Sequence, residues 1–366
     1  MRSRFNSLFA VTAAGLLLYG LPTNSRADVL YVTTELPDSI QKIASDGSSS
    51  IFANNNLSGP QGIAFDTSSN LYVANGENNT IEKFTPGGVG STFADTGVGS
   101  DPTGVAFDGA GNLFESNFNA DTIQKFTTGG TGSLFTNTAA NSGPTGLAFD
   151  SMGNLFVAYE GPNSIEEFTS DGMGSTFAIS SLGVSPFGLA FDSQTNLYVA
   201  NAARNTIAKF TPAGVGTIFA NTGLNEPVGL AFDSAGNLYA ANSGNNTIEK
   251  FTTNGTPSVF ASGLTGQPQF LAFTTDAGQP LRLLPSPPPL PVLNASRTAS
   301  NITIAITGET SGTTFTVQAT SVLGANASWT AIATNVTADV NGLAVFVDTN
   351  SISTFASRFY RALVQQ

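Results

Sequence analysis

Carboxylate and amide side chains are the groups of this 366-residue chain that could do chemistry, because the sequence contains no His and no Cys. A Ser-His-Asp triad, a Cys-His pair and a zinc site with His or Cys ligands are therefore excluded. Oxygen ligands remain. They suit Ca²⁺ or another divalent cation, although nothing in the sequence requires a cofactor. The candidate ligand-binding residues are Asn75, Asn117, Tyr159, Glu160, Asn201, Arg204, Asn242, Phe187 and Glu115.

The four Asn candidates recur at one place in a sequence repeat, so hydrogen bonding to loop backbone is an alternative role for them. The other five depart from that repeat, and the fold does not require them. Glu115 is the sharpest departure, because the equivalent residues are Val or Ala in a segment expected to be buried. A buried carboxylate must be paired, bound to a metal or protonated.

A turn of the form D-x-x-[G/S/T]-N also repeats along the chain. Its oxygens could bind Ca²⁺, but the spacing supplies fewer than the roughly 6–8 ligands that this ion takes. An Asx turn, in which the carboxylate accepts hydrogen bonds from nearby backbone N–H groups, explains the pattern better. The turns begin at Asp66, Asp108, Asp150, Asp192 and Asp233.

All five lysines share another place in the repeat, and Glu167 takes that place in the remaining unit. A basic ring for an anionic polymer is one interpretation. The favoured alternative is a long side chain that lies over apolar surface and keeps its ammonium group in water. These lysines are Lys42, Lys83, Lys125, Lys209 and Lys250.

The repeat itself predicts the elements that position these residues. Its first full unit, residues 62–94, reads GIAFDTSSNLYVANGENNTIEKFTPGGVGSTFA and contains four apolar runs of strand length separated by turn residues. Four antiparallel strands in a unit of this period are typical of a β-propeller blade. The Phe that ends the first run recurs every 41 or 42 residues, at Phe65, Phe107, Phe149, Phe191, Phe232 and Phe273.

The two ends of the repeat region complement one another. Residues 28–53 contain the second, third and fourth runs without the first, and the missing run occurs at residues 269–273. Each type of run then occurs six times, and pairing the two ends would leave no open sheet edge. The sequence therefore predicts an all-β fold: a six-bladed β-propeller over residues 28–275, whose N-terminal blade is closed by a C-terminal strand.

One face of such a ring is the expected binding surface. The loops before the first run and after the second run emerge there, beside the channel, and they carry most of the candidates above. Acids near this mouth are Glu35, Glu77, Asp101, Asp121, Glu160 and Glu226. Residues that precede the first run are Gln61, Thr103, Thr145, Phe187, Val228 and Gln269.

The segments GPQGIAFDTSSNLYVAN, GPTGLAFDSMGNLFVAY and EPVGLAFDSAGNLYAAN resemble the NHL-type propeller repeat. They are also similar to the SMP-30/gluconolactonase-like and virginiamycin B lyase-like propellers. The resemblance covers residues 28–275 and implies the fold. It leaves the activity open, since such families include lactonases, lyases and rings that only bind protein or carbohydrate. The lyase-like members rely on His, so the resemblance does not bring their chemistry to this chain.

The first 27 residues have the pattern of a signal peptide: Arg2 and Arg4, an apolar core over residues 8–21, and small residues around Arg26. We expect a secreted protein, extracellular or at the cell surface, with the periplasm as an alternative. Cleavage after Ala27 removes three of the 13 basic side chains and leaves 10 against 25 acidic ones, a net charge of −15. This charge disfavours nucleic acid and anionic membrane as partners, and we expect no membrane insertion after cleavage.

The repeat stops after Thr275. Residues 276–291 are Pro-rich and read as an extended linker. Residues 292–366 contain short alternating segments, near 302–306, 314–318, 329–333, 343–347 and 358–362, which predict a small β-sandwich. The runs TFTVQAT, SWTAIAT, VFVDT and RFYRAL resemble C-terminal fibronectin-like modules of secreted bacterial proteins.

Three functional hypotheses follow. The leading one is a non-catalytic binding or adhesion scaffold whose loop face takes an extracellular protein, a glycan or a small molecule. The alternative is an SMP-30/gluconolactonase-like hydrolase that depends on a divalent metal at an acidic, Asn-rich mouth. A matrix component without a small ligand is the third.

Overall fold

The computed structural model describes residues 28–179, 185–275, 279 and 281, together with the strands of the C-terminal segment. These residues form β-strands and one short 3-10 helix, η1 (Ala202–Arg204). None of the described residues belongs to a helix long and apolar enough to cross a membrane. The signal peptide predicted for residues 1–27 and nearly all of the linker predicted for 276–291 lie outside the described residues.

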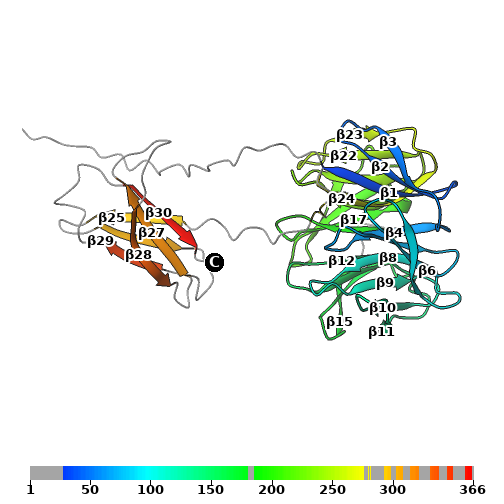
Figure 1. The fold of residues 1–366 in the computed structure, drawn as a ribbon, viewed down its shortest axis with the longest axis horizontal. Helices are drawn as coiled ribbons and strands as arrows, with labels where there is room; N and C mark the ends of the chain where they lie inside the picture. Colours follow the sequence, from blue (N-terminus) through cyan, green and yellow to red (C-terminus); the bar gives the residue numbers. More distant parts are fainter. Residues whose placement is uncertain are drawn as a thin grey trace, which may run out of the picture. The chain divides into compact units, whose positions relative to one another are not determined.

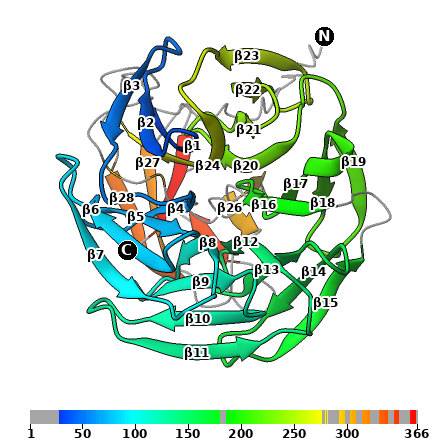
Figure 2. The same ribbon diagram turned by 90° about the vertical axis from the view of Figure 1, so that its right-hand side faces the viewer.

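The predicted ring of six blades is confirmed, and each blade is a four-stranded antiparallel sheet (Figures 1 and 2). From the innermost to the outermost strand, blade 1 contains β24 (Gln267–Thr274), β1 (Val29–Glu35), β2 (Ser39–Ile43) and β3 (Ser49–Ala53), and blade 2 contains β4 (Pro60–Phe65), β5 (Leu71–Asn75), β6 (Thr80–Phe84) and β7 (Gly90–Asp95). Blade 3 contains β8 (Pro102–Phe107), β9 (Leu113–Asn117), β10 (Thr122–Phe126) and β11 (Gly132–Asn137), and blade 4 contains β12 (Pro144–Phe149), β13 (Leu155–Tyr159), β14 (Ser164–Phe168) and β15 (Gly174–Ile179). Blade 5 contains β16 (Pro186–Phe191), β17 (Leu197–Asn201), β18 (Thr206–Phe210) and β19 (Gly216–Ala220), and blade 6 contains β20 (Pro227–Phe232), β21 (Leu238–Asn242), β22 (Thr247–Phe251) and β23 (Pro257–Ala261).

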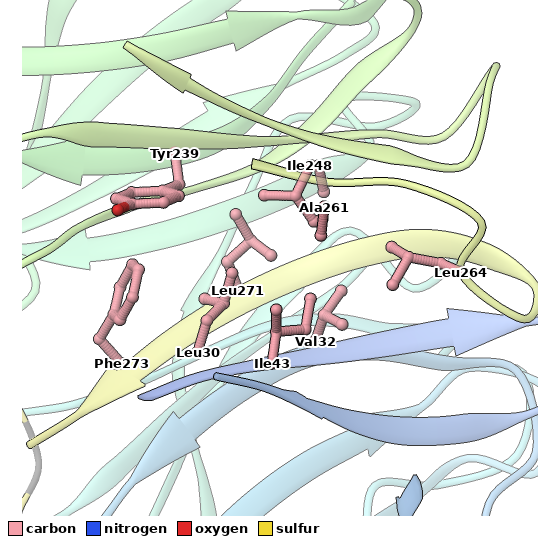
Figure 3. Packing of buried hydrophobic residues seen from close by; sticks show 10 residues of the cluster. Leu30, Val32, Ile43, Tyr239, Ile248, Ala261, Leu264, Leu271 and Phe273 are labelled. Atoms are coloured by element: carbon pink, nitrogen blue, oxygen red, sulfur yellow. The ribbon is translucent and has the colours of Figure 1, made fainter. Parts of the chain in front are cut away.

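Blade 1 closes the ring as predicted, because its innermost strand β24 comes from the far end of the repeat region. β24 pairs antiparallel with β1, with Leu30 opposite Phe273 and Val32 opposite Leu271. Figure 3 shows these side chains packed with Tyr239 and other residues of blade 6. The closing strand therefore supplies both hydrogen bonds to blade 1 and apolar surface to blade 6.

The second strand of each blade is apolar on both faces because each sheet packs against two neighbours. In blade 2, Leu71 and Val73 face a cluster shared with blade 1, whereas Tyr72 and Ala74 face a cluster shared with blade 3. Alternate residues of a strand point to opposite sides of the sheet, so a continuous apolar run is required here. These second strands are therefore buried between neighbouring blades.

Aromatic rings link the blades near the rim. Tyr72 meets Phe93 and Phe107 edge to face, with ring centroids 4.9 and 5.0 Å apart, and equivalent groups occur around the ring. The Lys83 ammonium lies 5.2 Å from the Tyr72 centroid and 3.8 Å from the Asp66 carboxylate. All five lysines lie over such a ring, at 5.0–5.9 Å. They are rim residues, in agreement with the favoured interpretation.

The repeated aspartates form Asx turns, as expected. Asp66 Oδ1 accepts hydrogen bonds from the backbone N–H groups of Ser68 and Asn70 at 2.9 and 2.8 Å, and its Oδ2 accepts one from the Asn70 amide. Asp108 and Asp233 repeat the arrangement. The carboxylate oxygens are therefore used by the turn.

The innermost strands approach one another so closely that a side chain does not fit at some positions. A Cβ atom added to Gly146 in β12 would lie 2.2 Å from the Phe187 carbonyl oxygen of β16. The obstacle is backbone of the next blade, so neither rotamer changes nor local repacking can remove it.

Gly146→Ala is consequently expected to lower the free energy of unfolding by about 1–3 kcal/mol, the usual cost of overpacking. Urea unfolding followed by circular dichroism measures this. Gly109→Ala is the matched control, because a Cβ at Gly109 would meet nothing within 4 Å. Equal stability of both variants would show that the inner strands can move apart freely.

The described residues of the C-terminal segment form six strands in two three-stranded antiparallel sheets. One sheet has the order β25 (Val292–Arg297), β26 (Ile302–Thr307), β29 (Ala344–Asp348), and the other β28 (Thr330–Thr337), β27 (Thr314–Thr320), β30 (Phe359–Val364). Five of these strands coincide with predicted segments, and β25 was not predicted. The β-sandwich itself stays a prediction.

Candidate functional site: an acidic pocket at the mouth of the ring

The mouth is built from two kinds of loop that hydrogen-bond to each other, which confirms that they emerge on one face. In blade 2, the N–H groups of Gly76 and Glu77, in the β5–β6 hairpin, donate to the carbonyl oxygens of Gly59 and Ser58, just before β4. Asn79 ends this hairpin with φ 59°, a left-handed conformation that Asn tolerates better than most residues. Its Oδ1 accepts from the Asp101 N–H of the next blade at 3.0 Å.

A pocket of 410 Å³ opens between blades 1, 2 and 3 at this mouth, and three carboxylates line it. Glu35 ends β1, Glu77 lies in the β5–β6 hairpin, and Asp101 precedes β8. No basic side chain lines the pocket. Its lining residues are Glu35, Gly59, Gln61, Gly76, Glu77, Asn79, Gly99, Asp101 and Asn119.

Neutral donors hold these carboxylates in place. The Gln61 amide donates to Glu35 Oε1, Ser58 Oγ donates to Glu77 Oε2 at 3.2 Å, and the Asn119 amide donates to Asp101 Oδ2 at 3.1 Å. Each carboxylate has two oxygens, each with two lone pairs, so these bonds leave acceptor capacity toward the pocket. The pocket can therefore accept hydrogen bonds from a positively charged donor.

The carboxylates of the pocket also repel one another. Partial burial raises the pKa of Glu35, and the negative charges of Asp38 and Glu77 raise it further, against the hydrogen bond from Gln61. Burial likewise raises the pKa of Asp101. A cation in the pocket would relieve this repulsion, so its binding and the ionisation of Glu35 favour each other.

The four candidate Asn residues do not line this pocket, because all are buried. Asn75 Oδ1 accepts from the Ser58 N–H at 3.3 Å, and its amide donates to the Asn56 carbonyl at 3.0 Å. Asn242 ties residues 223 and 225 in the same way. Asn201 is 1 % exposed, and its amide donates to Thr206 Oγ1. Asn75 and Asn242 thus fasten blade-connecting loops, in agreement with the alternative role given to the repeated Asn residues. Asn117 and Asn201 bond side chains within their own hairpins, and a ligand-binding role for the four stays a prediction.

Glu115 is fully buried and has one hydrogen-bond partner among the described residues. The Asn117 amide donates to its Oε2 at 3.0 Å, whereas Glu115 Oε1 and Asn117 Oδ1 have no partner there. Burial raises the pKa of Glu115 well above its usual value, and the bond from Asn117 lowers it only in part. A protonated Glu115 could donate from Oε1 to Asn117 Oδ1, which would satisfy both orphan oxygens.

The other departures from the repeat lie in blades 4 and 5. Tyr159 ends β13 and is 1 % exposed. Glu160 follows it, and its Oε1 accepts from Ser185 Oγ at 2.8 Å. Phe187 is half-buried in β16, and Arg204 is exposed in η1. None of the four lines the acidic pocket.

No group of three acidic side chains that could hold a metal ion occurs in the described part of the chain. Glu35, Glu77 and Asp101 share a pocket without converging on one point. Reasoning from sequence placed these three acids and Gln61 near the mouth but missed Asn79 and Asn119. The repeated Asn or Asp that ends each hairpin was the available signal for Asn79, since a left-handed turn often ends in such a residue, whereas no repeated residue marks Asn119.

Comparison with protein-family models shows to which family the ring is related. The model of the virginiamycin B lyase family matches residues 7–276, well over half of the chain. The chain belongs to the virginiamycin B lyase family. Membership of this family agrees with the lyase-like part of the resemblance seen in the repeat. A comparison with curated protein sequences gives no significant match.

Solved structures similar to this virginiamycin B lyase family member share its fold. One is a catalytically inactive histidine-to-alanine variant of virginiamycin B lyase from Staphylococcus aureus with quinupristin, at 19 % identity and TM-score 0.52, covering 69 % of this chain and 93 % of that one. A chain of a nidogen/laminin complex is similar at 20 % identity and TM-score 0.61, and the match covers 68 % of this chain and 99 % of that one. A gluconolactonase from Xanthomonas campestris is similar at 14 % identity and TM-score 0.53, and the match covers 75 % of this chain and 93 % of that one.

Proposed function

We propose that this chain is a secreted, non-catalytic binding protein that captures a positively charged group of an extracellular partner in the acidic pocket. The observation that carries the proposal is the 410 Å³ pocket lined by Glu35, Glu77 and Asp101 without a basic side chain. Lys and Arg side chains suit it in size and charge. The signal-peptide pattern and the predicted C-terminal β-sandwich support a role outside the cytoplasm.

The charge distribution of the ring supports this choice of partner. Besides its five lysines, the ring region has one basic residue, Arg204. The lysines lie over aromatic rings at the rim, so their charges are kept away from the mouth. A mouth whose charges all have one sign attracts ligands of the opposite charge over long range, and this attraction weakens as salt is added.

Two observations favour binding over the related activities. The lyase from Staphylococcus aureus is inactive when a histidine is replaced by alanine, and this sequence has no histidine. A group of three acidic ligands would favour the gluconolactonase-like alternative, and the described residues contain none. Similarity to a ring crystallised in a nidogen/laminin complex is compatible with binding to protein.

Replacing Glu77 by Gln and Asp101 by Asn together is expected to weaken binding of a fluorescent oligo-arginine peptide about tenfold at low salt. Two partly exposed ion pairs of up to about 1 kcal/mol each account for this effect. Fluorescence anisotropy at two salt concentrations measures it. A control with Glu160→Gln and Glu226→Gln removes the same charge elsewhere on the mouth and should bind like the wild type.

Two outcomes would contradict the proposal. Equal weakening in both double variants would mean that the peptide senses overall charge only. Hydrolysis of a lactone by the full chain, dependent on added Ca²⁺ and lost with Glu77→Gln and Asp101→Asn, would identify the metal-dependent hydrolase instead.

A further inference from the structure

A second cavity lies in blade 4, away from the acidic pocket. It has a volume of 270 Å³ and is bounded by the end of β13, by β14 and β15, and by the loop that leads from β11 to β12. Its polar lining residues include Tyr159, Ser164 and Glu166, and its apolar ones are Ala139 and Pro162. It shares no lining residue with the mouth pocket.

The cavity occurs where blade 4 departs from the repeat. In blades 2 and 6, an Asn at the end of the second strand ties down the preceding loop through two hydrogen bonds. Tyr159 replaces that Asn and makes no such bonds. The loop of blade 4 is held from blade 3, because the Asp121 carboxylate accepts from the N–H groups of residues 141, 142 and 143 at 2.7–3.0 Å.

The polar groups of this cavity are incompletely used. Tyr159 is 1 % exposed, and its hydroxyl lies beside the Glu166 carboxylate but makes no hydrogen bond of normal geometry within the described part of the chain. A buried hydroxyl without a partner costs about 1–3 kcal/mol, so such groups normally meet a water molecule or a ligand. Burial and the nearby Glu166 carboxylate raise the pKa of Tyr159, which keeps the phenol neutral and able both to donate and to accept.

Charge then selects the class of ligand. Glu166 is the one charged residue among those that line the cavity, and no Lys or Arg lines it. A carboxylate beside hydroxyl groups in a partly enclosed space suits a group with several N–H donors and a positive charge. An anionic ligand would be repelled, and a purely apolar ligand would leave the carboxylate without a partner.

We propose that the blade 4 cavity binds a small organic ammonium ion, with Glu166 as its charge partner and the Tyr159 hydroxyl as a hydrogen-bond partner. Ser164 is a further polar residue of the lining. The proposal is independent of the function assigned to the mouth, because the two sites share no residue.

Isothermal titration calorimetry of the full chain tests this with ethanolamine as the probe. Ethylene glycol, which lacks the charge, and acetate, which has the opposite sign, are the matched probes. In the Glu77→Gln, Asp101→Asn variant, whose mouth pocket has lost two of its three carboxylates, we expect one ethanolamine to bind per chain, with at least tenfold weaker binding of the other two. Binding that persists in this variant distinguishes this site from the mouth.

Variants locate the site. Glu166→Gln should weaken ethanolamine binding at least tenfold, and Tyr159→Phe about three- to tenfold. Tyr159→Asn restores the residue found in four other blades and should abolish binding without unfolding the ring, which circular dichroism verifies. Glu82→Gln changes the equivalent carboxylate of blade 2 and should have no effect. No binding at 10 mM probe, equal binding of ethylene glycol, or unchanged binding by Glu166→Gln would each overturn the proposal.

Discussion

A chain that runs from Asp28 to Leu264 is expected not to form a closed ring, because it lacks β24. Blade 1 would lose its innermost strand, and β1 would expose an unpaired edge. The loss of buried Leu271 and Phe273 alone removes about 1.5–3 kcal/mol for each side chain. Together with the lost strand pairing, this approaches the whole stability of a typical domain.

A chain from Asp28 to Arg282 is the matched control, since it keeps β24 and lacks the same C-terminal module. Size-exclusion chromatography and circular dichroism should show a folded monomer for the longer chain and aggregation or disorder for the shorter one. An open edge strand is a template for association, so aggregation is the expected failure. A cooperative unfolding transition in the shorter chain would contradict closure by β24.

Glu115→Gln is expected to stabilise the protein at neutral pH by about 3 kcal/mol, because keeping the buried carboxyl protonated costs about 1.4 kcal/mol for each pH unit above its unfolded pKa. The folded state raises the pKa of Glu115 above that of the unfolded chain, so folding takes up a proton. The stability contributed by the protonated group is complete below the unfolded pKa near 4.5 and is lost as pH rises through the folded pKa. Gln keeps the neutral hydrogen bonds at every pH.

Thermal unfolding of both proteins between pH 4 and pH 8 measures this difference. The variant and the wild type should be similarly stable at pH 4 and should diverge as the pH rises. Glu167→Gln, on the rim-side strand β14, controls for the loss of one negative charge and should not diverge. A variant less stable than the wild type at pH 8 would mean that an ionised Glu115 has a partner.

The architecture of the ring was predictable because one pattern repeats six times. Turn residues recur at the same offsets, and the apolar runs have strand length, so blade count and closure follow from aligning Phe65 with its five equivalents. The missing first run in residues 28–53 had a single available partner at 269–273. Strand β24 occupies that place.

The site was less predictable because its residues come from loops of different blades. Glu35 and Asp101 are 66 positions apart, and they share a pocket only through the curvature of the ring. Asn79 could be recognised as a turn residue, but its hold on the loop of blade 3 depends on the spacing between blades. A recurring polar residue such as Asn75 indicated importance, yet only its buried position shows that it fastens a loop.

Tyr159 is a second residue whose role the sequence could not predict. Its departure from the repeat was visible in the sequence, whereas the cavity beside it depends on where Asp121 of blade 3 holds the neighbouring loop. Departures from a repeat therefore indicate where to look, and the packing around them decides what they do.

Val29 pairs with Thr274 in one sheet, and this pairing has a further consequence for how such rings can evolve. The covalent chain starts and finishes the toroid at adjacent positions, so no sector is intrinsically first. Circular permutation would preserve every pairing if the old ends were joined and a surface turn were cut. The sequence repeat begins with the first strand of a blade, whereas the chain enters the ring at the second strand of blade 1. This shift of one strand joins the two ends of the chain in one sheet and closes the ring.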